Sequence, residues 1–194
     1  MKKDIKTIPL LCLLIFTITM LGGCGTTEAG VSKTQTDFSI VDEQGKVVKY
    51  LTADNDDVVK VKEVAEGLFK AMNNRSYESL KGDEEYGYYT EALIKVLKEK
   101  NDQANTVNGY RENQLVTTDA GMDKFTVKFD TDGTTCTITV TSKTTIASAT
   151  DAYLKAMNIA SKGTIGCDYT LGFIKSADVW RVNKISANSP YALK

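Results

Sequence analysis

The chain of 194 residues contains no histidine. This absence excludes zinc sites with imidazole ligands, the Ser-His-Asp and Cys-His nucleophile systems, and imidazole general bases. An enzyme would have to work with Asp, Glu, Tyr or Lys instead. The composition therefore favours a protein that binds over one that catalyses, and it leaves the question of an enzyme open.

A strong charge of one sign is also lacking. The chain has 24 Lys and Arg against 25 Asp and Glu, and no stripe of basic residues appears. A nucleic-acid-binding domain needs such a stripe to neutralise phosphates, so we expect no nucleic acid partner. The length suits one domain with a sizeable core, and it is too short for a two-lobed solute-binding protein.

No apolar run is long enough to cross a membrane as a helix. The mainly apolar stretch from Ile8 to Leu21 has 14 residues, whereas about 20 are needed to span roughly 30 Å of hydrocarbon. It follows a basic start with Lys2, Lys3 and Lys6. This order is that of a secretory signal peptide.

The apolar run ends in Leu21-Gly22-Gly23-Cys24, which resembles the lipobox of bacterial lipoproteins. The resemblance implies that residues 1–23 are a signal peptide and that a dedicated peptidase cuts before Cys24, which carries the lipid. Diacylglyceryl and palmitate chains together would anchor the protein stably, at the extracytoplasmic face of the cell membrane. The alternative is an uncleaved membrane helix with an incidental cysteine.

The next segments lead towards the main domain. Residues 24–37 are rich in Thr, Ser and Gly, which predicts a flexible tether. Short apolar pieces on either side of Asp42-Glu43-Gln44-Gly45 predict a small hairpin, which we interpret as a lead-in over residues 38–55.

Helical periodicity begins after a cluster of acidic residues. Asp54 to Asp57 favour a helix start because their charge suits the positive end of the helix dipole. Apolar residues then recur with a period of 3.6, which predicts an amphipathic helix over 56–73. The pattern also predicts helices over 76–80 and 90–103.

The apolar period then changes from 3.6 to 2, which is typical of strands. The sequence predicts a weak strand over 110–118 and a tail over 188–194, and the stretch 150–161 permits one or two helical turns. The remaining strands are predicted over 125–129, 134–146, 166–175 and 179–185. Helices followed by strands indicate an α+β fold, with N-terminal helices packed on a curved antiparallel sheet.

Residues 56–187 resemble the NTF2-like (SnoaL-like, cystatin-like) superfamily. The resemblance rests on Leu68-Phe69-Lys70-Ala71-Met72, on the polar break Asn73-Asn74-Arg75 that follows it, and on the closing strand Asp178-Val179-Trp180-Arg181-Val182. It implies a cone formed by a curved sheet around a long helix. The superfamily includes isomerases, dehydratases, assembly subunits and binders, so the fold alone does not give the function.

Two groups of residues are candidates for binding. Tyr86, Tyr88 and Tyr89 could line the open end of the cone, or could simply pack helix ends against the sheet. Thr137 and Thr139 alternate with apolar residues, so they should face outward on a flat, uncharged and Thr-rich sheet surface that suits contact with another protein.

The acidic residues suggest neither a metal site nor a catalytic site. Asp130-Thr131-Asp132-Gly133 lacks most ligands of a calcium loop and predicts a hairpin turn. Asp168 should face outward from its strand, and no clear acid lies on the predicted inner faces. We therefore expect no catalytic residue, no metal and no cofactor.

Alternation places Cys136 and Cys167 on inward faces. If their strands are antiparallel neighbours, the two cysteines lie at opposite ends of the pair, roughly 30 Å apart at about 3.3 Å per residue. A disulfide needs Cα atoms within about 7 Å. We therefore expect two buried free thiols, although export and an even count would favour a disulfide.

These features favour a membrane-anchored lipoprotein that acts as a binding or assembly module at the cell envelope, with envelope proteins as possible partners. The alternative is a small lyase or isomerase that uses Tyr and a carboxylate in the cone.

The lipobox predicts that Cys24 is acylated. When the full chain is expressed in a bacterial host, its mature N-terminus should be a lipid-modified Cys24, because the peptidase recognises the modified cysteine. Cys24→Ala should accumulate as an unprocessed precursor. Mass spectrometry of the N-terminal peptide checks both outcomes, and a mature N-terminus elsewhere would show that the resemblance misleads.

Overall fold

The computed structural model describes residues 37–159 and 163–193, so the predicted signal peptide, Cys24 and most of the tether lie outside the described residues. The helices are α1 (Asp56–Asn73), the 3-10 helix η1 (Tyr86–Tyr88), α2 (Glu91–Glu99), α3 (Asp102–Asn113) and α4 (Asp151–Ala156). The strands are β1 (Phe38–Val41), β2 (Val47–Tyr50), β3 (Arg75–Ser76), β4 (Val116–Phe129), β5 (Thr135–Ser148), β6 (Thr164–Ser176), β7 (Val179–Ala187) and β8 (Tyr191–Ala192). Among these helices, none is long and apolar enough to cross a membrane.

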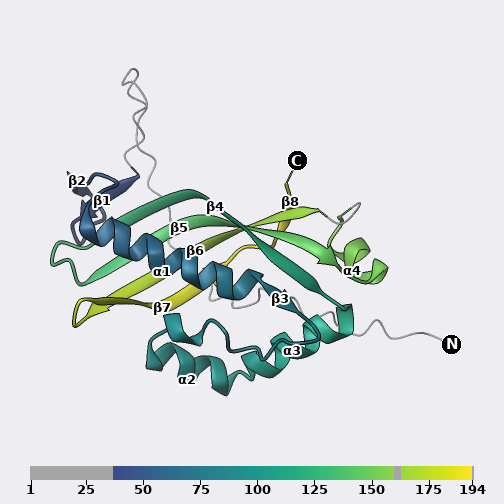
Figure 1. The fold of residues 1–194 in the computed structure, drawn as a ribbon. Coiled ribbons are helices and arrows are strands. Elements are labelled where there is room, and N and C mark those ends of the chain that lie inside the picture. Colours follow the sequence, from purple (N-terminus) through teal and green to yellow (C-terminus); the bar gives the residue numbers. More distant parts are fainter. Residues whose placement is uncertain (1–36, 160–162, 194) are drawn as a thin grey trace.

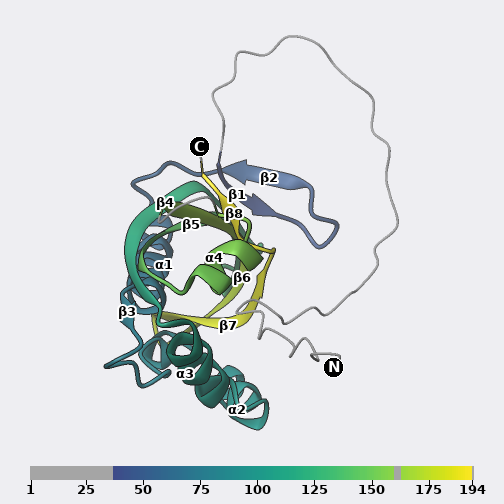
Figure 2. The ribbon, with the colours of Figure 1, turned by 90° about the vertical axis from the view of Figure 1, so that its right-hand side faces the viewer.

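The strands form a mixed sheet in the order β2-β1-β4-β5-β6-β7, with β3 beside β4 and β8 beside β6. Neighbouring strands are antiparallel except for β1 and β4, which are parallel. The sheet curls strongly around α1, and α2 and α3 lie together at one side (Figures 1 and 2). The fold class is therefore α+β with helices on a curved sheet, as the sequence predicts.

Helix α1 fills the concave side of the sheet. Asn55 caps it by accepting hydrogen bonds from the backbone N–H groups of Asp57 and Val58. Its buried apolar stripe packs with inward residues of the sheet in one core. The stripe consists of Val58, Val61, Ala65, Leu68 and Phe69, and its sheet partners include Val127, Ile138, Leu171, Phe173 and Val182.

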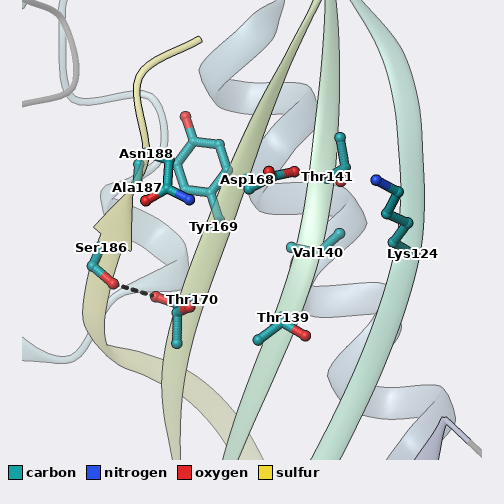
Figure 3. Close-up of a pocket in the computed structure, with 10 residues that line it drawn as sticks. All are labelled: Lys124, Thr139, Val140, Thr141, Asp168, Tyr169, Thr170, Ser186, Ala187 and Asn188. Atoms are coloured by element: carbon teal, nitrogen blue, oxygen red, sulfur yellow. Dashed lines mark hydrogen bonds between the residues drawn. The ribbon is translucent and has the colours of Figure 1, made fainter. Parts of the chain in front are cut away.

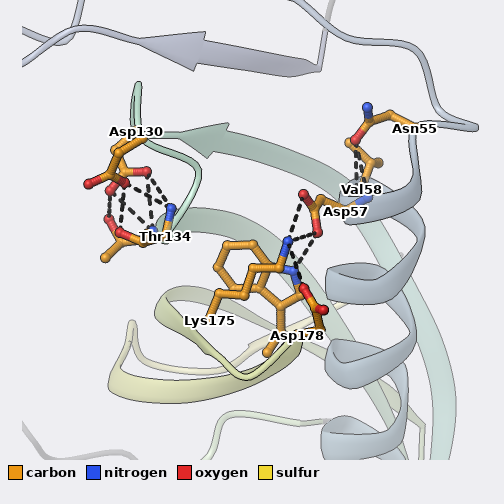
Figure 4. Close-up of polar contacts among 10 residues, drawn as sticks. Asn55, Asp57, Val58, Asp130, Thr134, Lys175 and Asp178 are labelled. Carbon is orange, nitrogen blue, oxygen red and sulfur yellow. Dashed lines mark hydrogen bonds and ion pairs between the residues drawn. The ribbon is translucent and has the colours of Figure 1, made fainter.

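Polar contacts hold both ends of α1. At its start, the Asp57 carboxylate accepts hydrogen bonds from Lys175 Nζ and Trp180 Nε1, both at 3.0 Å (Figure 4). At its end, Asn73 Nδ2 donates to Asp119 Oδ1 and Ser142 Oγ, both at 2.9 Å. These contacts join one helix to four strands, so they set its diagonal path across the sheet.

Two bulges bend β4 around the helix. Asp119 lies opposite Thr144 and Met122 opposite Ser142, so β4 has one more residue than β5 in this interval, and a second shift follows between Asp123 and Thr126. Bulges increase the local bend and twist of a strand. Gly121 has a φ of 87° and Lys124 has a φ of 52°, a region that favours glycine. The weak strand and the strand at 125–129 that the sequence predicts are thus one continuous bent strand.

Several predicted helix bounds are wrong. Asn101 adopts a left-handed conformation with a φ of 54° and separates α2 from α3, so the helix expected over 90–103 is two helices. Helix α3 extends to Asn113, where a strand beginning at residue 110 was expected, because Tyr110 is buried by helical packing. The helix expected over 76–80 is absent: Ser76 ends β3, and residues 77–79 form a turn.

The lead-in and the tail belong to the sheet. The predicted hairpin is observed as β1 and β2, but β1 also pairs with β4, so residues 38–55 do not stand apart from the domain. Likewise β8 pairs with β6, so residues 188–193 are not a free tail. In the ambiguous stretch 150–161, residues 151–156 form the short helix α4, and residues 160 and 161 lie outside the described residues.

Cys136 and Cys167 are both buried and are not joined by a disulfide, as predicted. Cys136 on β5 lies opposite Phe173 on β6. Cys167 on β6 lies opposite Ser142, which is six positions further along β5 than Cys136. This separation is about 20 Å at 3.3 Å per residue, shorter than expected but far beyond disulfide range. Burial raises the pKa of the Cys136 thiol.

A buried ion pair attaches the segment that follows α1. The Arg75 guanidinium donates a hydrogen bond to the Glu85 carboxylate. Arg75 is only 7% exposed and Glu85 only 4%. Arg75 also lies 6.0 Å from the ring centroid of Tyr110 on α3, and the Tyr110 and Thr117 hydroxyls lie 3.0 Å apart. The pair therefore links β3, η1 and α3 to the sheet.

The bulge geometry predicts a backbone cost at Gly121. Nothing lies within 4 Å of the position of an added Cβ there, so Gly121→Ala should lose about 1–2 kcal/mol through left-handed strain alone. Gly87→Ala is the matched control, because its Cβ site is equally open and its φ is not positive. Urea unfolding measures both, and equal stabilities would contradict the bulge.

The Arg75–Glu85 pair predicts a non-additive response. Arg75→Met should lose about 3–5 kcal/mol, because it leaves the Glu85 carboxylate buried without a cation. The double variant Arg75→Met/Glu85→Leu should lose much less, since no charge stays buried. Unfolding free energies from urea titrations test this, and a double variant less stable than the single one would refute the pairing.

Candidate functional site

The outer surface of β5 and β6 is the most regular feature that the sequence singled out. Burial alternates along β5, where Cys136, Ile138 and Val140 are buried and Thr135, Thr137 and Thr139 are exposed. We call this surface the outer face. It consists of Thr135, Thr137 and Thr139 on β5 and of Thr170, Gly172 and Ile174 on β6.

The outer face is neither uncharged nor flat, in contrast to the prediction. One row of residues crosses four neighbouring strands. It consists of Lys128 on β4, Thr137 on β5, Gly172 on β6 and Lys184 on β7. The two lysines are exposed and flank a floor of small residues. The charge was missed because it comes from neighbouring strands, whose register a single sequence does not reveal, and the bulges of β4 curl the sheet.

A hollow of about 310 Å³ lies at one end of the outer face (Figure 3). Asp168 lines it and accepts hydrogen bonds from the hydroxyls of Thr141, at 2.6 Å, and of Tyr191, at 3.0 Å. The Thr141 hydroxyl, the Tyr191 hydroxyl and the Lys124 ammonium lower the pKa of Asp168. Asp168 thus faces outward as predicted, whereas Thr141, which continues the alternation of Thr137 and Thr139, is buried.

The three candidate tyrosines pack between α1 and the edge of β7. Tyr89 is buried, forms a bridge with Val182, and places its hydroxyl 3.9 Å from the sulfur of Met72. The Tyr88 ring covers Gly67 so closely that an added Cβ would lie 2.6 Å from it. Tyr86 lies beside Tyr89, with ring centroids 6.1 Å apart. This arrangement favours packing over ligand binding for all three.

Glu85 and Tyr86 are the acid and tyrosine that the enzyme alternative would require. Burial raises the pKa of Glu85, and the Arg75 guanidinium opposes this effect. The Tyr86 hydroxyl is buried and has no hydrogen-bond partner in the described part of the chain. Neither residue lines the hollow at Asp168 or the second hollow, which lies between α1 and β4. Glu85 therefore acts as a structural partner of Arg75, a role that no sequence pattern indicated.

A second hollow, of about 470 Å³, lies between α1 and the bulged part of β4. Phe69, Met122 and Phe125 contribute apolar surface to it. Its rim carries both signs of charge, and Asp123 there is paired with Lys143 at 3.1 Å. The residues that line it are Lys62, Glu66, Phe69, Lys70, Asp119, Gly121, Met122, Asp123, Lys124 and Phe125.

The acidic turn between β4 and β5 uses its carboxylates internally. Asp130 accepts hydrogen bonds from the backbone N–H groups of Thr134 and Thr135, at 3.1 and 3.2 Å (Figure 4). Asp132 accepts from the Thr134 N–H and hydroxyl. Within residues 37–159 and 163–193, no three acidic or cysteine side chains are grouped so that they could hold a metal ion.

No protein-family model matches the sequence, and no curated protein shows significant sequence similarity to it. Two solved structures are similar in outline. An IcmL-like type IV secretion system protein from Legionella pneumophila subsp. pneumophila str. Philadelphia 1 has a TM-score of 0.48 and 10% identity, over 70% of this chain and 94% of that one. The intermembrane space region of the chloroplast protein ARC6 has a TM-score of 0.40 and 11% identity, over 73% and 99%. At these values neither likeness supports a functional conclusion for this chain.

Proposed function

We propose that this protein is a membrane-anchored lipoprotein whose NTF2-like domain acts on the extracytoplasmic side as a binding or assembly module. Its lipid is attached at Cys24, and its domain works by contact with another envelope protein through the outer face. The anchor rests on the lipobox and on the short apolar run before it. The mode of action rests on how the interior of the sheet is filled.

The filled interior carries the proposal. Val61, Ala65 and Leu68 of α1 are 0% exposed, and so are Val127, Ile138 and Leu171 of the sheet. Close packing of this kind leaves no room for a small-molecule substrate among these residues. The hollow of about 470 Å³ lies at the edge of this core, where α1 faces β4, and most of its lining residues are charged. Contacts with a partner must then be made on the outside of the domain.

The outer face supports protein contact more than the other surfaces do. It presents hydroxyl and glycine surface on regular strands, and its lysines can form charged contacts at the rim of an interface. The hollow at Asp168 adds polar groups at one end. The tyrosines and the Arg75–Glu85 pair are already engaged in the fold.

Site-specific photo-crosslinking tests this proposal. A benzophenone side chain at Thr137 or Thr139, in the full chain in its own cells, should crosslink a discrete protein band. The same group at Lys95 or Val96, on the exposed side of α2, is the matched control and should give none. All four sites are exposed, so the replacements should change stability by less than about 0.5 kcal/mol.

Thermal unfolding of each variant verifies that the fold is intact. Crosslinks from α2 without any from Thr137 and Thr139 would place the contact elsewhere and refute the proposal. Turnover of a small molecule by the full chain that Glu85→Gln abolishes without loss of stability would instead support the lyase or isomerase alternative.

A further inference from the structure

The charge on the outer face is segregated from the rest of a chain that is slightly acidic overall. Lys124, Lys128, Arg181 and Lys184 surround the face, and its floor contains no acidic residue. In the described part of the chain, neither Lys128 nor Lys184 has a carboxylate oxygen within 4.0 Å of its Nζ.

The acids nearest this surface are already engaged. Asp123 pairs with Lys143, and Asp168 accepts from Thr141 and Tyr191. At the other end, Asp178 lies 3.7 Å from Lys175, and the turn acids Asp130 and Asp132 accept hydrogen bonds from Thr134 and Thr135. Among residues 37–159 and 163–193, no carboxylate therefore forms an ion pair with Lys128 or Lys184.

The spacing of the two lysines matches an extended chain. Three strand intervals of about 4.8 Å separate β4 from β7, so Lys128 and Lys184 are about 14 Å apart at their Cα atoms. Between them lie Thr137 and Gly172. Gly172 has no side chain that would stand between the lysines, and an added Cβ there would be crowded by Cβ of Lys184 at 3.3 Å. One extended polypeptide with its side chains, about 10 Å wide, fits this strip.

We infer that the outer face binds an extended acidic segment of a partner protein, with its carboxylates on Lys128 and Lys184 and its backbone over Thr137 and Gly172. This inference rests on the proposed function and specifies the chemistry of the partner. An anionic lipid surface fits less well, because a strongly curled sheet is convex on this side and would touch a flat membrane only along its crest.

Footprinting of lysines in the full chain, reconstituted in phosphatidylcholine vesicles, tests the inference. The probe is a synthetic peptide that alternates Glu and Ser over about 8 residues, which spans about 26 Å when extended. It should slow acylation of Lys128 and Lys184 by an amine-reactive reagent about fivefold at low salt, and the protection should vanish near 0.5 M salt, where charges are screened within about 4 Å. Lys95 and Lys98 on α2 serve as internal controls and should show no protection. An uncharged peptide that alternates Gln and Ser is the control for the probe and should leave Lys128 and Lys184 unprotected.

Three results would overturn the inference. The Glu-Ser peptide could fail to protect Lys128 and Lys184, or could protect Lys95 and Lys98 equally. Phosphatidylglycerol vesicles could protect Lys128 and Lys184 without any peptide, which would make a lipid surface the partner. Finally, the crosslink from Thr137 could persist in Lys128→Gln/Lys184→Gln, in which case protein contact stands and an acidic partner does not.

Discussion

The packing of α1 inside the curled sheet is the contact on which the rest of the structure depends. Its apolar stripe supplies much of the core, and each large side chain that it buries contributes about 1.5–3 kcal/mol. Asp57 and Asn73 hold the two ends of the helix against the sheet, because each joins one end of α1 to side chains of a different strand pair.

The curl of the sheet is the second half of the same constraint. The bulges at Gly121 and Lys124 let β4 bend around the helix. Strand β1 then extends the sheet by pairing with the last residues of β4. Because the concave side is occupied by α1, the convex side is the large regular surface left for recognition. The inside of the sheet thus provides stability, and the contact with a partner that we propose is placed on the outside.

The features that could be predicted from the sequence depend on local signals. The period of 3.6 and the acidic start predicted α1, and alternation predicted the inward and outward sides of β5 and β6. Helix α3 was missed because its polar, Asn-rich sequence has little apolar periodicity, and its burial comes from Tyr110 and Gly109 alone. The outer lysines were missed for a different reason. Lys128 and Lys184 are 56 positions apart in the sequence, and only the strand register places them on one row with Thr137 and Gly172.

The core between α1 and the sheet contains no ligand-sized space, since the hollow of about 470 Å³ lies at its edge, where α1 faces β4. The unfolding free energy of Leu68→Ala tests this most directly, because Leu68 is 0% exposed in the middle of α1. In a close-packed core this change should cost about 2–5 kcal/mol, as the lost contacts are not replaced. A loss below about 1 kcal/mol would mean that Leu68 lines an open cavity, which would contradict the filled interior and favour a small-molecule site.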